Sequence, residues 1–174
     1  RVNADAVIIL PNNSNIIMAA QSAAGLSEVP CAVVPTKSVP QAFSALFSAD
    51  ETASLEENVE NMTSAFADTK TGEVTTAIKD SKDAHDNPIH NGDVIGIADG
   101  SIEAVGSSVE DVVMSLLDTM EVEDADTLTL LAGEDFSDEQ LDALVERIES
   151  RFDELEIDAH RGEQPLYPIV FSVE

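Results

Sequence analysis

Apolar residues follow regular periods along this chain, and these predict alternating strands and helices in its first third. Continuous apolar runs of strand length occupy residues 6–10 and 31–34, as expected of strands covered on both faces. Each run leads through a turn into a stretch with helical spacing, residues 16–25 and residues 41–47. Gly25 is the expected C-cap of the first of these helices. This order of elements is typical of α/β proteins.

Three further helices are marked by a capping residue that precedes apolar positions at helical spacing. Ser54 and Glu57 have the spacing of a capping box, in which side chains and backbone N–H groups cap each other. Ser137 and Gln140 repeat that pattern before the last predicted helix. Ser108 begins the remaining one, ahead of a stripe of valines and leucines.

Elsewhere the apolar runs are short, which predicts strands. Strands are expected at residues 74–79, 94–98, 102–105, 127–131, 156–160 and 167–173. Asp99 and Gly100 between two of them indicate a tight hairpin, because glycine tolerates positive φ. We therefore predict an α/β protein of two small subdomains, residues 1–82 and 83–174, with a β-hairpin or meander near the middle. The boundary is expected between residues 80 and 108.

The net charge of −27, from 35 acidic against eight basic residues, is the strongest compositional signal. Residues 1–49 hold only Asp5 and Glu28, whereas residues 119–174 hold seventeen carboxylates. Such a field repels phosphate backbones and anionic lipids, so neither nucleic acid nor direct membrane insertion is expected. Two compatible interpretations remain: a surface that keeps the protein soluble, also in a salty cytoplasm, and an acidic face that binds a basic partner.

The sequence contains no set of residues typical of an active site. It has no glycine-rich nucleotide motif, no metal-ligand spacing among its three histidines, and no nucleophile elbow. The single cysteine, Cys31, lies in an apolar run, where a buried structural thiol and a cytoplasmic protein are expected. The chain is therefore predicted to be non-catalytic and to hold no metal or cofactor.

Three groups of turn residues are candidates for binding. Asn12, Asn13 and Asn15 follow the first predicted strand, and Thr36 and Lys37 follow the second, where α/β proteins often keep a crevice. The turn before the last strand adds a further pair, Gln164 and Tyr167. Helix capping and turn formation explain the same residue types. A small-molecule- or anion-binding regulatory domain that uses turns 11–15 and 35–40 therefore stays open as an alternative.

Five ordered segments closely resemble the C-terminal region of the dihydroxyacetone-kinase-like protein of the bacterial fatty acid kinase. They are IILPNNSNIIMAA (8–20), VVPTKSVPQA (33–42), SLEENVENM (54–62), NGDVIGIADG (91–100) and GEQPLYP (162–168). Together they span essentially the whole chain. This sequence departs from the family at Glu163, where the family commonly has a second glycine.

The resemblance implies a division of labour between separate domains. It implies an ATP- and magnesium-binding kinase domain and a central domain in the same polypeptide, neither of which is in this chain. The chain begins before a strand with no initiating Met, so we expect a fragment of a longer protein. The C-terminal region is expected to have a DegV-like fold in two subdomains that holds no lipid.

The resemblance also implies a partner. In this family an acidic groove meets the basic face of a DegV-type fatty-acid-binding protein, whose acyl carboxylate is then phosphorylated. We expect loop and helix-start carboxylates to line that groove here, and the candidates are Glu134, Asp135, Asp138 and Glu139.

Overall fold

The computed structural model describes residues 3–67, 69–122 and 125–174. Contacts divide the chain into two compact units, an N-terminal unit (Arg1–Thr69) and a C-terminal unit (Lys70–Glu174). No helix of the described residues is long and apolar enough to cross a bilayer. Each unit is described on its own.

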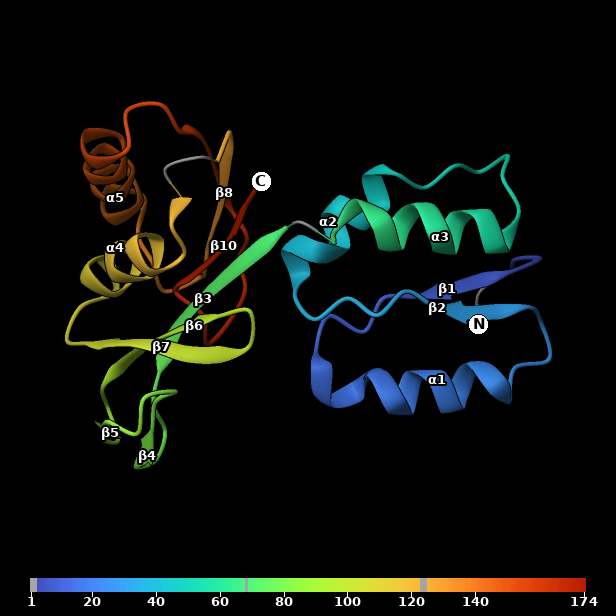
Figure 1. Cartoon of the computed structure of the whole chain (residues 1–174), viewed down its shortest axis with the longest axis horizontal. Coiled ribbons are helices and arrows are strands. Elements are labelled where there is room, and N and C mark those ends of the chain that lie inside the picture. The colour runs from blue at the N-terminus through green and yellow to red at the C-terminus, as the bar shows by residue number, and fades with distance from the viewer. Residues whose placement is uncertain (1–2, 68, 123–124) are drawn as a thin grey trace. The chain divides into compact units, whose positions relative to one another are not determined.

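The N-terminal unit is a small βαβ arrangement followed by two helices (Figure 1). Its elements are β1 (Val7–Ile9), a 3₁₀ turn η1 (Ser14–Ile16), α1 (Ile17–Gly25), β2 (Cys31–Val33), α2 (Val39–Phe47) and α3 (Leu55–Ala65). β1 and β2 pair in parallel, and Figure 1 shows α1 and α3 on opposite faces of this two-stranded sheet. Their parallel pairing explains why both strands read as continuous apolar runs.

The core of the N-terminal unit lies between its strands and α3. Val34, Ala45 and Met62 are fully buried there, and Ile8, Leu10, Val59 and Phe66 pack against them. Cys31 is half-buried, less covered than its apolar surroundings predicted.

Local capping sets the ends of these helices. Ser38 accepts a hydrogen bond from the backbone N–H of Gln41, so α2 begins at Val39, two residues before the predicted start. The capping box of Ser54 and Glu57 is confirmed at α3. Gly25 is wrong as a C-cap: it is the last helical residue, and the chain leaves α1 through Leu26 with ordinary right-handed backbone angles.

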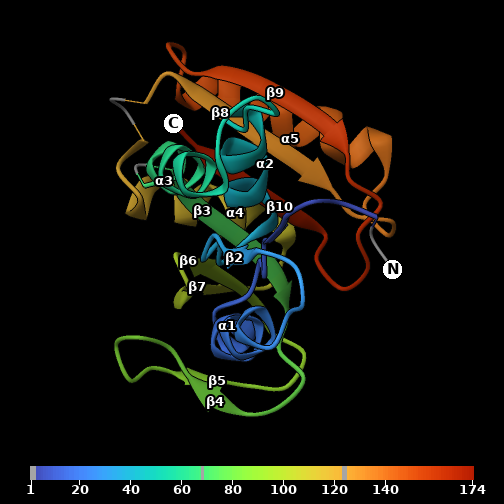
Figure 2. The same cartoon turned by 90° about the vertical axis from the view of Figure 1, so that its right-hand side faces the viewer.

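The C-terminal unit is built on a six-stranded mixed sheet in the order β7-β6-β3-β10-β8-β9 (Figure 2). All neighbours are antiparallel except β8 and β9. Helices α4 and α5 both lie on one face of this sheet (Figure 1). The elements are β3 (Lys70–Thr76), β4 (Ser81–Lys82), β5 (Pro88–Ile89), β6 (Val94–Ala98), β7 (Ser101–Gly106), α4 (Val109–Thr119), β8 (Thr127–Ala132), α5 (Asp138–Arg151), β9 (Glu156–Arg161) and β10 (Ile169–Val173).

The main core fills the space between the sheet and the two helices. Each strand contributes alternate residues, and each helix contributes its apolar stripe. The fully buried residues of this core are Val74, Val113, Leu116, Leu117, Leu128, Leu130, Ala132, Leu144, Ile148, Ile169 and Phe171.

Strand β3 differs from the prediction at its start. It begins at Lys70, four residues before the predicted strand, because Lys70 to Glu73 pair with β10. The contact-based division therefore falls between Thr69 and Lys70, before this strand, whereas the sequence places the boundary at residues 82 and 83. The tight hairpin is confirmed, since Asp99 and Gly100 have φ of 47° and 91°.

The α/β fold class predicted from the sequence is confirmed. The predicted hairpin region near the middle corresponds to the two-stranded β4–β5 ribbon and the β6–β7 hairpin.

The pairing of Gly72 with Phe171 provides the first testable prediction. A Cβ at Gly72 would overlap the Phe171 ring, which is completely buried. We expect Gly72→Ala to lower the free energy of unfolding of the C-terminal unit by about 1–3 kcal/mol, because the core must shift to admit a methyl group. Tyr167 is the only tyrosine and the chain has no tryptophan, so tyrosine fluorescence during urea unfolding reports this unit alone.

Gly25→Ala is the matched control, because a Cβ there meets nothing within 4 Å. It should leave the midpoint of the Tyr167 signal unchanged. A Gly72→Ala midpoint equal to that of the wild type would contradict the packing described.

Candidate functional site

Two loops meet at one end of the C-terminal sheet. The first, residues 133–137, leads from β8 into α5, and the second, residues 162–168, connects β9 to β10. The backbone N–H of Gly133 donates to the carbonyl of Pro168 at 2.9 Å, and that of Glu134 donates to the carbonyl of Gln164 at 3.1 Å. The two loops are therefore fixed to each other by main-chain bonds.

Gln164 strengthens this junction with its side chain. Its Nε2 donates to the carbonyl of Leu131 at 2.7 Å and to that of Tyr167 at 3.2 Å. A Cβ on Gly133 would lie 2.7 Å from the carbonyl oxygen of Gln164, so the loops approach as closely as they do only because residue 133 is glycine. The amide of Gln164 thus stabilises the loop.

Arg161 holds the same loops from the other side. Its guanidinium donates to the carbonyl of Phe136 and, at 3.0 Å, to that of Gly133. Its nitrogens also lie 3.6 Å from a carboxylate oxygen of Asp138 and 3.7 Å from one of Glu163. One of the few cations in the chain is therefore used to fix the backbone that carries several acids.

The four predicted partner-binding acids lie together at this end of the unit. Glu134 and Asp135 are exposed on the first loop, and Asp138 and Glu139 are exposed in the first turn of α5. We call these four residues the acidic cluster. The capping box of Ser137 and Gln140, confirmed by the structure, starts the helix beneath them. Carboxylates in a first helical turn also interact favourably with the helix dipole.

Further exposed acids follow along α5, and they outnumber the basic residues of this helix. Asp142, Glu146 and Glu149 are exposed, and none has a Lys or Arg nitrogen within 4.0 Å in the described part of the chain. The two basic residues of this helix, Arg147 and Arg151, pair with acids of α4. Among the described residues, exposed acids around the acidic cluster therefore outnumber the basic residues that pair with them.

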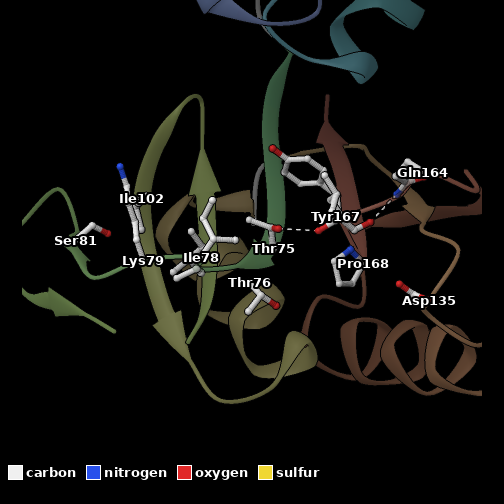
Figure 3. A pocket seen from close by; sticks show the side chains of 13 residues that line it. Thr75, Thr76, Ile78, Lys79, Ser81, Ile102, Asp135, Gln164, Tyr167 and Pro168 are labelled. Atoms are coloured by element: carbon white, nitrogen blue, oxygen red, sulfur yellow. Dashed lines mark hydrogen bonds between the residues drawn. The ribbon is translucent and has the colours of Figure 1, made fainter. Parts of the chain in front are cut away.

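A pocket of about 640 Å³ opens beside the acidic cluster (Figure 3). Its lining combines aliphatic side chains from β6, β7, the segment between β3 and β4 and the β9–β10 loop with several polar groups: Thr75, Thr76, Ala77, Ile78, Lys79, Ser81, Ile95, Ile102, Asp135, Gln164, Leu166, Tyr167 and Pro168. Thr75 donates from its hydroxyl to the carbonyl of Leu166 at 2.7 Å, which ties the loop to β3. Gln164 and Tyr167, predicted as turn residues, both line this pocket.

Two ionisable groups near this loop are perturbed by burial. Glu73 lies on the sheet face opposite the helices, and burial raises the pKa of its carboxyl above 4.5. Burial, and then the nearby charge of Glu73, raise the pKa of the Tyr167 phenol above its usual value of 10.0. Tyr167 is thus a neutral side chain at neutral pH.

The other predicted turn residues belong to the N-terminal unit. The backbone N–H of Asn12 donates to the Thr36 hydroxyl at 3.2 Å, and that hydroxyl donates to the side-chain oxygen of Asn12 at 2.7 Å. Asn13 accepts from the N–H of Asn15, and the Lys37 side chain is exposed. The structure therefore brings the two turns together, but Thr36 is fully buried and is used in holding them.

Several residues of the site carry no signal in the sequence. Arg161 ends a polar strand, Glu73 is one of 35 acids, and the exposed Ile78 resembles any strand residue. They become notable only because the fold brings distant segments together, such as Thr75 and Leu166, which lie 91 residues apart. Within the described residues no three His, Cys, Asp or Glu side chains form a group that could hold a metal ion.

Comparison with known proteins identifies the family. The model of the FakA-like family, which describes the C-terminal region of fatty acid kinase proteins, matches residues 1–174. This chain belongs to that family. It is 41% identical over 174 residues to protein YloV of Bacillus subtilis and 41% identical over 167 residues to protein SH1689 of Staphylococcus haemolyticus. These matches cover 99% and 96% of this chain, but only 31% and 30% of the two relatives.

Solved structures confirm the DegV-like fold that the resemblance implied. A DegV family protein from Corynebacterium glutamicum superposes with a TM-score of 0.63 at 16% identity, over 97% of this chain and 74% of that one. A DegV family protein from Eubacterium eligens, loaded with heptadecanoic acid, gives a TM-score of 0.61 at 15% identity, over 99% of this chain and 74% of the other. At such low identity the likeness concerns the fold.

The backbone at Glu163, where the resemblance leads us to expect glycine, has an unusual conformation. Its φ of 55° lies in the left-handed region, which glycine adopts without strain. We expect Glu163→Gly to raise the free energy of unfolding of the C-terminal unit by about 0.5–1 kcal/mol, the relief of strain less the greater entropy of an unfolded glycine. The measurement is urea unfolding followed by Tyr167 fluorescence.

Glu163→Ala is the matched control, because it removes the carboxylate near Arg161 but keeps the Cβ that causes the strain. It should show no gain. An equal gain from both variants would mean that charge, not backbone conformation, limits stability at this position.

Glu73 provides a pH-dependent prediction. Because its pKa is raised in the folded chain, its ionisation opposes folding, and this effect grows as pH rises through the raised pKa. We expect Glu73→Gln to be more stable than the wild type, by a larger margin at about pH 8 than at about pH 5. Glu156→Gln, at an exposed position, controls for the loss of one negative charge and should show a flatter dependence.

Proposed function

We propose that this domain docks a DegV-type fatty-acid-binding protein, called the carrier below, through its acidic cluster. Docking would present the acyl carboxylate of the bound fatty acid to a kinase domain elsewhere in the full-length polypeptide. The domain itself would be non-catalytic, and ATP and magnesium would bind to that kinase domain. The whole assembly would act in the cytoplasm.

The observation that carries this proposal is the acidic cluster, because this chain belongs to the FakA-like family. The four carboxylates are exposed: Glu134 and Asp135 lie on a loop held by main-chain hydrogen bonds, and Asp138 and Glu139 lie in the first turn of α5, next to further exposed acids of that helix. Only an electropositive surface is complementary to them, so the contacting face of the carrier should be basic. Membership of the family supports a role alongside a fatty acid kinase.

Such an interface suits a partner that must arrive and leave. Complementary charges raise the encounter rate and set the orientation, whereas each exposed ion pair adds roughly 0.2–1 kcal/mol. The attraction extends over a Debye length of about 10 Å at 0.1 M salt and is screened beyond it. Binding should therefore be of modest affinity and weaken with salt.

The experiment reverses two charges of the cluster. We expect Glu134→Lys combined with Asp135→Lys to weaken binding of a fatty-acid-loaded carrier from the same genome by about tenfold at low salt, because attraction becomes repulsion at two exposed sites. The difference should shrink as salt is added. Dissociation constants are measured by analytical ultracentrifugation over a series of salt concentrations.

A control with the same change in net charge separates local from global electrostatics. Glu51→Lys with Glu60→Lys replaces two exposed acids of the N-terminal unit. If this pair weakens binding as much as the first, overall charge and not the acidic cluster governs docking. Turnover of ATP and fatty acid by this chain alone would contradict the non-catalytic role.

A further inference from the structure

The mouth of the C-terminal pocket carries two aliphatic side chains that the fold does not bury. Ile78 is 86% exposed and Leu166 is 79% exposed, and both line the pocket. Behind them, Ile95 is buried and Ile102 half-buried, so the apolar surface continues inward. Neighbouring exposed apolar side chains around a concavity mark a surface that binds something apolar.

Leu166 is conformationally unusual as well as exposed. Its φ is 69°, in the left-handed region that a leucine adopts at a cost of roughly 1–2 kcal/mol. The turn would form more readily with glycine or asparagine, and burial of the side chain provides no compensation. Neither folding nor packing within this chain explains a leucine at this place. A contact with a molecule or domain outside this chain would explain it.

The polar groups of the lining make the two sides of the pocket chemically different. Asp135, a member of the acidic cluster, lies at one side, whereas Lys79 and Ser81 lie with the β3–β4 segment (Figure 3). The pocket is therefore continuous with the proposed docking surface. A basic residue of a partner is attracted at the Asp135 side and repelled at the Lys79 side.

We propose that the pocket receives an apolar side chain of the carrier that is flanked by a lysine or arginine, which pairs with Asp135. This inference rests on the proposed docking function and specifies its contact. The apolar anchor, enclosed by Ile78 and Leu166, supplies most of the affinity, and the acidic cluster supplies the rate and orientation of encounter. Division into a central apolar anchor and a charged rim is common in protein interfaces.

The two contributions differ in their response to salt. Ion pairs with the acidic cluster weaken as ionic strength rises, whereas burial of apolar surface does not. Affinity that remains at high salt therefore measures the pocket, and the slope of affinity against salt measures the cluster.

The test uses Ile78→Ser and Leu166→Asn, singly and together, in the carrier-binding measurement. Both side chains are exposed and asparagine tolerates positive φ, so neither change should lower the unfolding midpoint. We expect each to weaken binding about tenfold to a hundredfold at every salt concentration with an unchanged salt slope. Leu26→Asn, which removes an equally exposed leucine outside the pocket lining, is the control and should bind as the wild type does.

The outcomes separate this inference from the docking proposal. If the pocket variants bind like the wild type while Glu134→Lys with Asp135→Lys loses affinity, the pocket inference is wrong and the docking proposal stands. If Leu26→Asn weakens binding as much as Leu166→Asn, general apolar exposure is responsible and the inference is also wrong. Failure of the wild-type chain to bind any carrier of its genome would overturn both.

Discussion

The pairing of β10 with both β3 and β8 is the constraint on which the C-terminal unit depends. All five residues of β10 are buried, and the register places Phe171 opposite Gly72 on one side and Leu130 on the other. Because Gly72 has no side chain, the Phe171 ring occupies that space and fixes the register. The same register brings the carbonyl of Pro168 within hydrogen-bonding distance of the N–H of Gly133. The loops of the candidate site are therefore positioned by the central strand.

Charge imposes a second constraint, because only eight basic residues are available to pair with 35 acids. Arg161 binds backbone carbonyls of the β8–α5 loop, and Lys70 donates to the carbonyl of Met120 at 2.7 Å. Arg147 and Arg151 tie α5 to α4. Several cations thus hold elements in place, and most carboxylates of the described residues have no Lys or Arg nitrogen within 4.0 Å. The excess of exposed acids around the acidic cluster is a consequence of where the few cations are used.

Local signals in the sequence were sufficient for most elements and insufficient for the site. Capping boxes and the Asp99-Gly100 hairpin involve residues three or fewer apart, so their chemistry is visible in the chain. The start of β3 was missed because its outer face carries Thr71 and Glu73 and reads as polar. The pocket is lined by β3, the segment that follows it, β6, β7 and two distant loops, and Leu166 is informative only once its exposure and φ are known. Such features depend on tertiary structure, which the spacing of apolar residues within one segment does not reveal.

The conformation of the β9–β10 loop does not depend on the side chains at its two left-handed positions, Glu163 and Leu166. Its conformation is held mainly by main-chain groups: the N–H of Glu163 donates to Ala132, and the carbonyl of Leu166 accepts from Thr75. Neither side chain at these two left-handed positions contributes to those bonds. Folding therefore favours glycine or asparagine at both, but tolerates Glu163 and Leu166 at a modest loss of stability. At Leu166 the proposed contact with the carrier gives a reason for a leucine that folding alone does not favour.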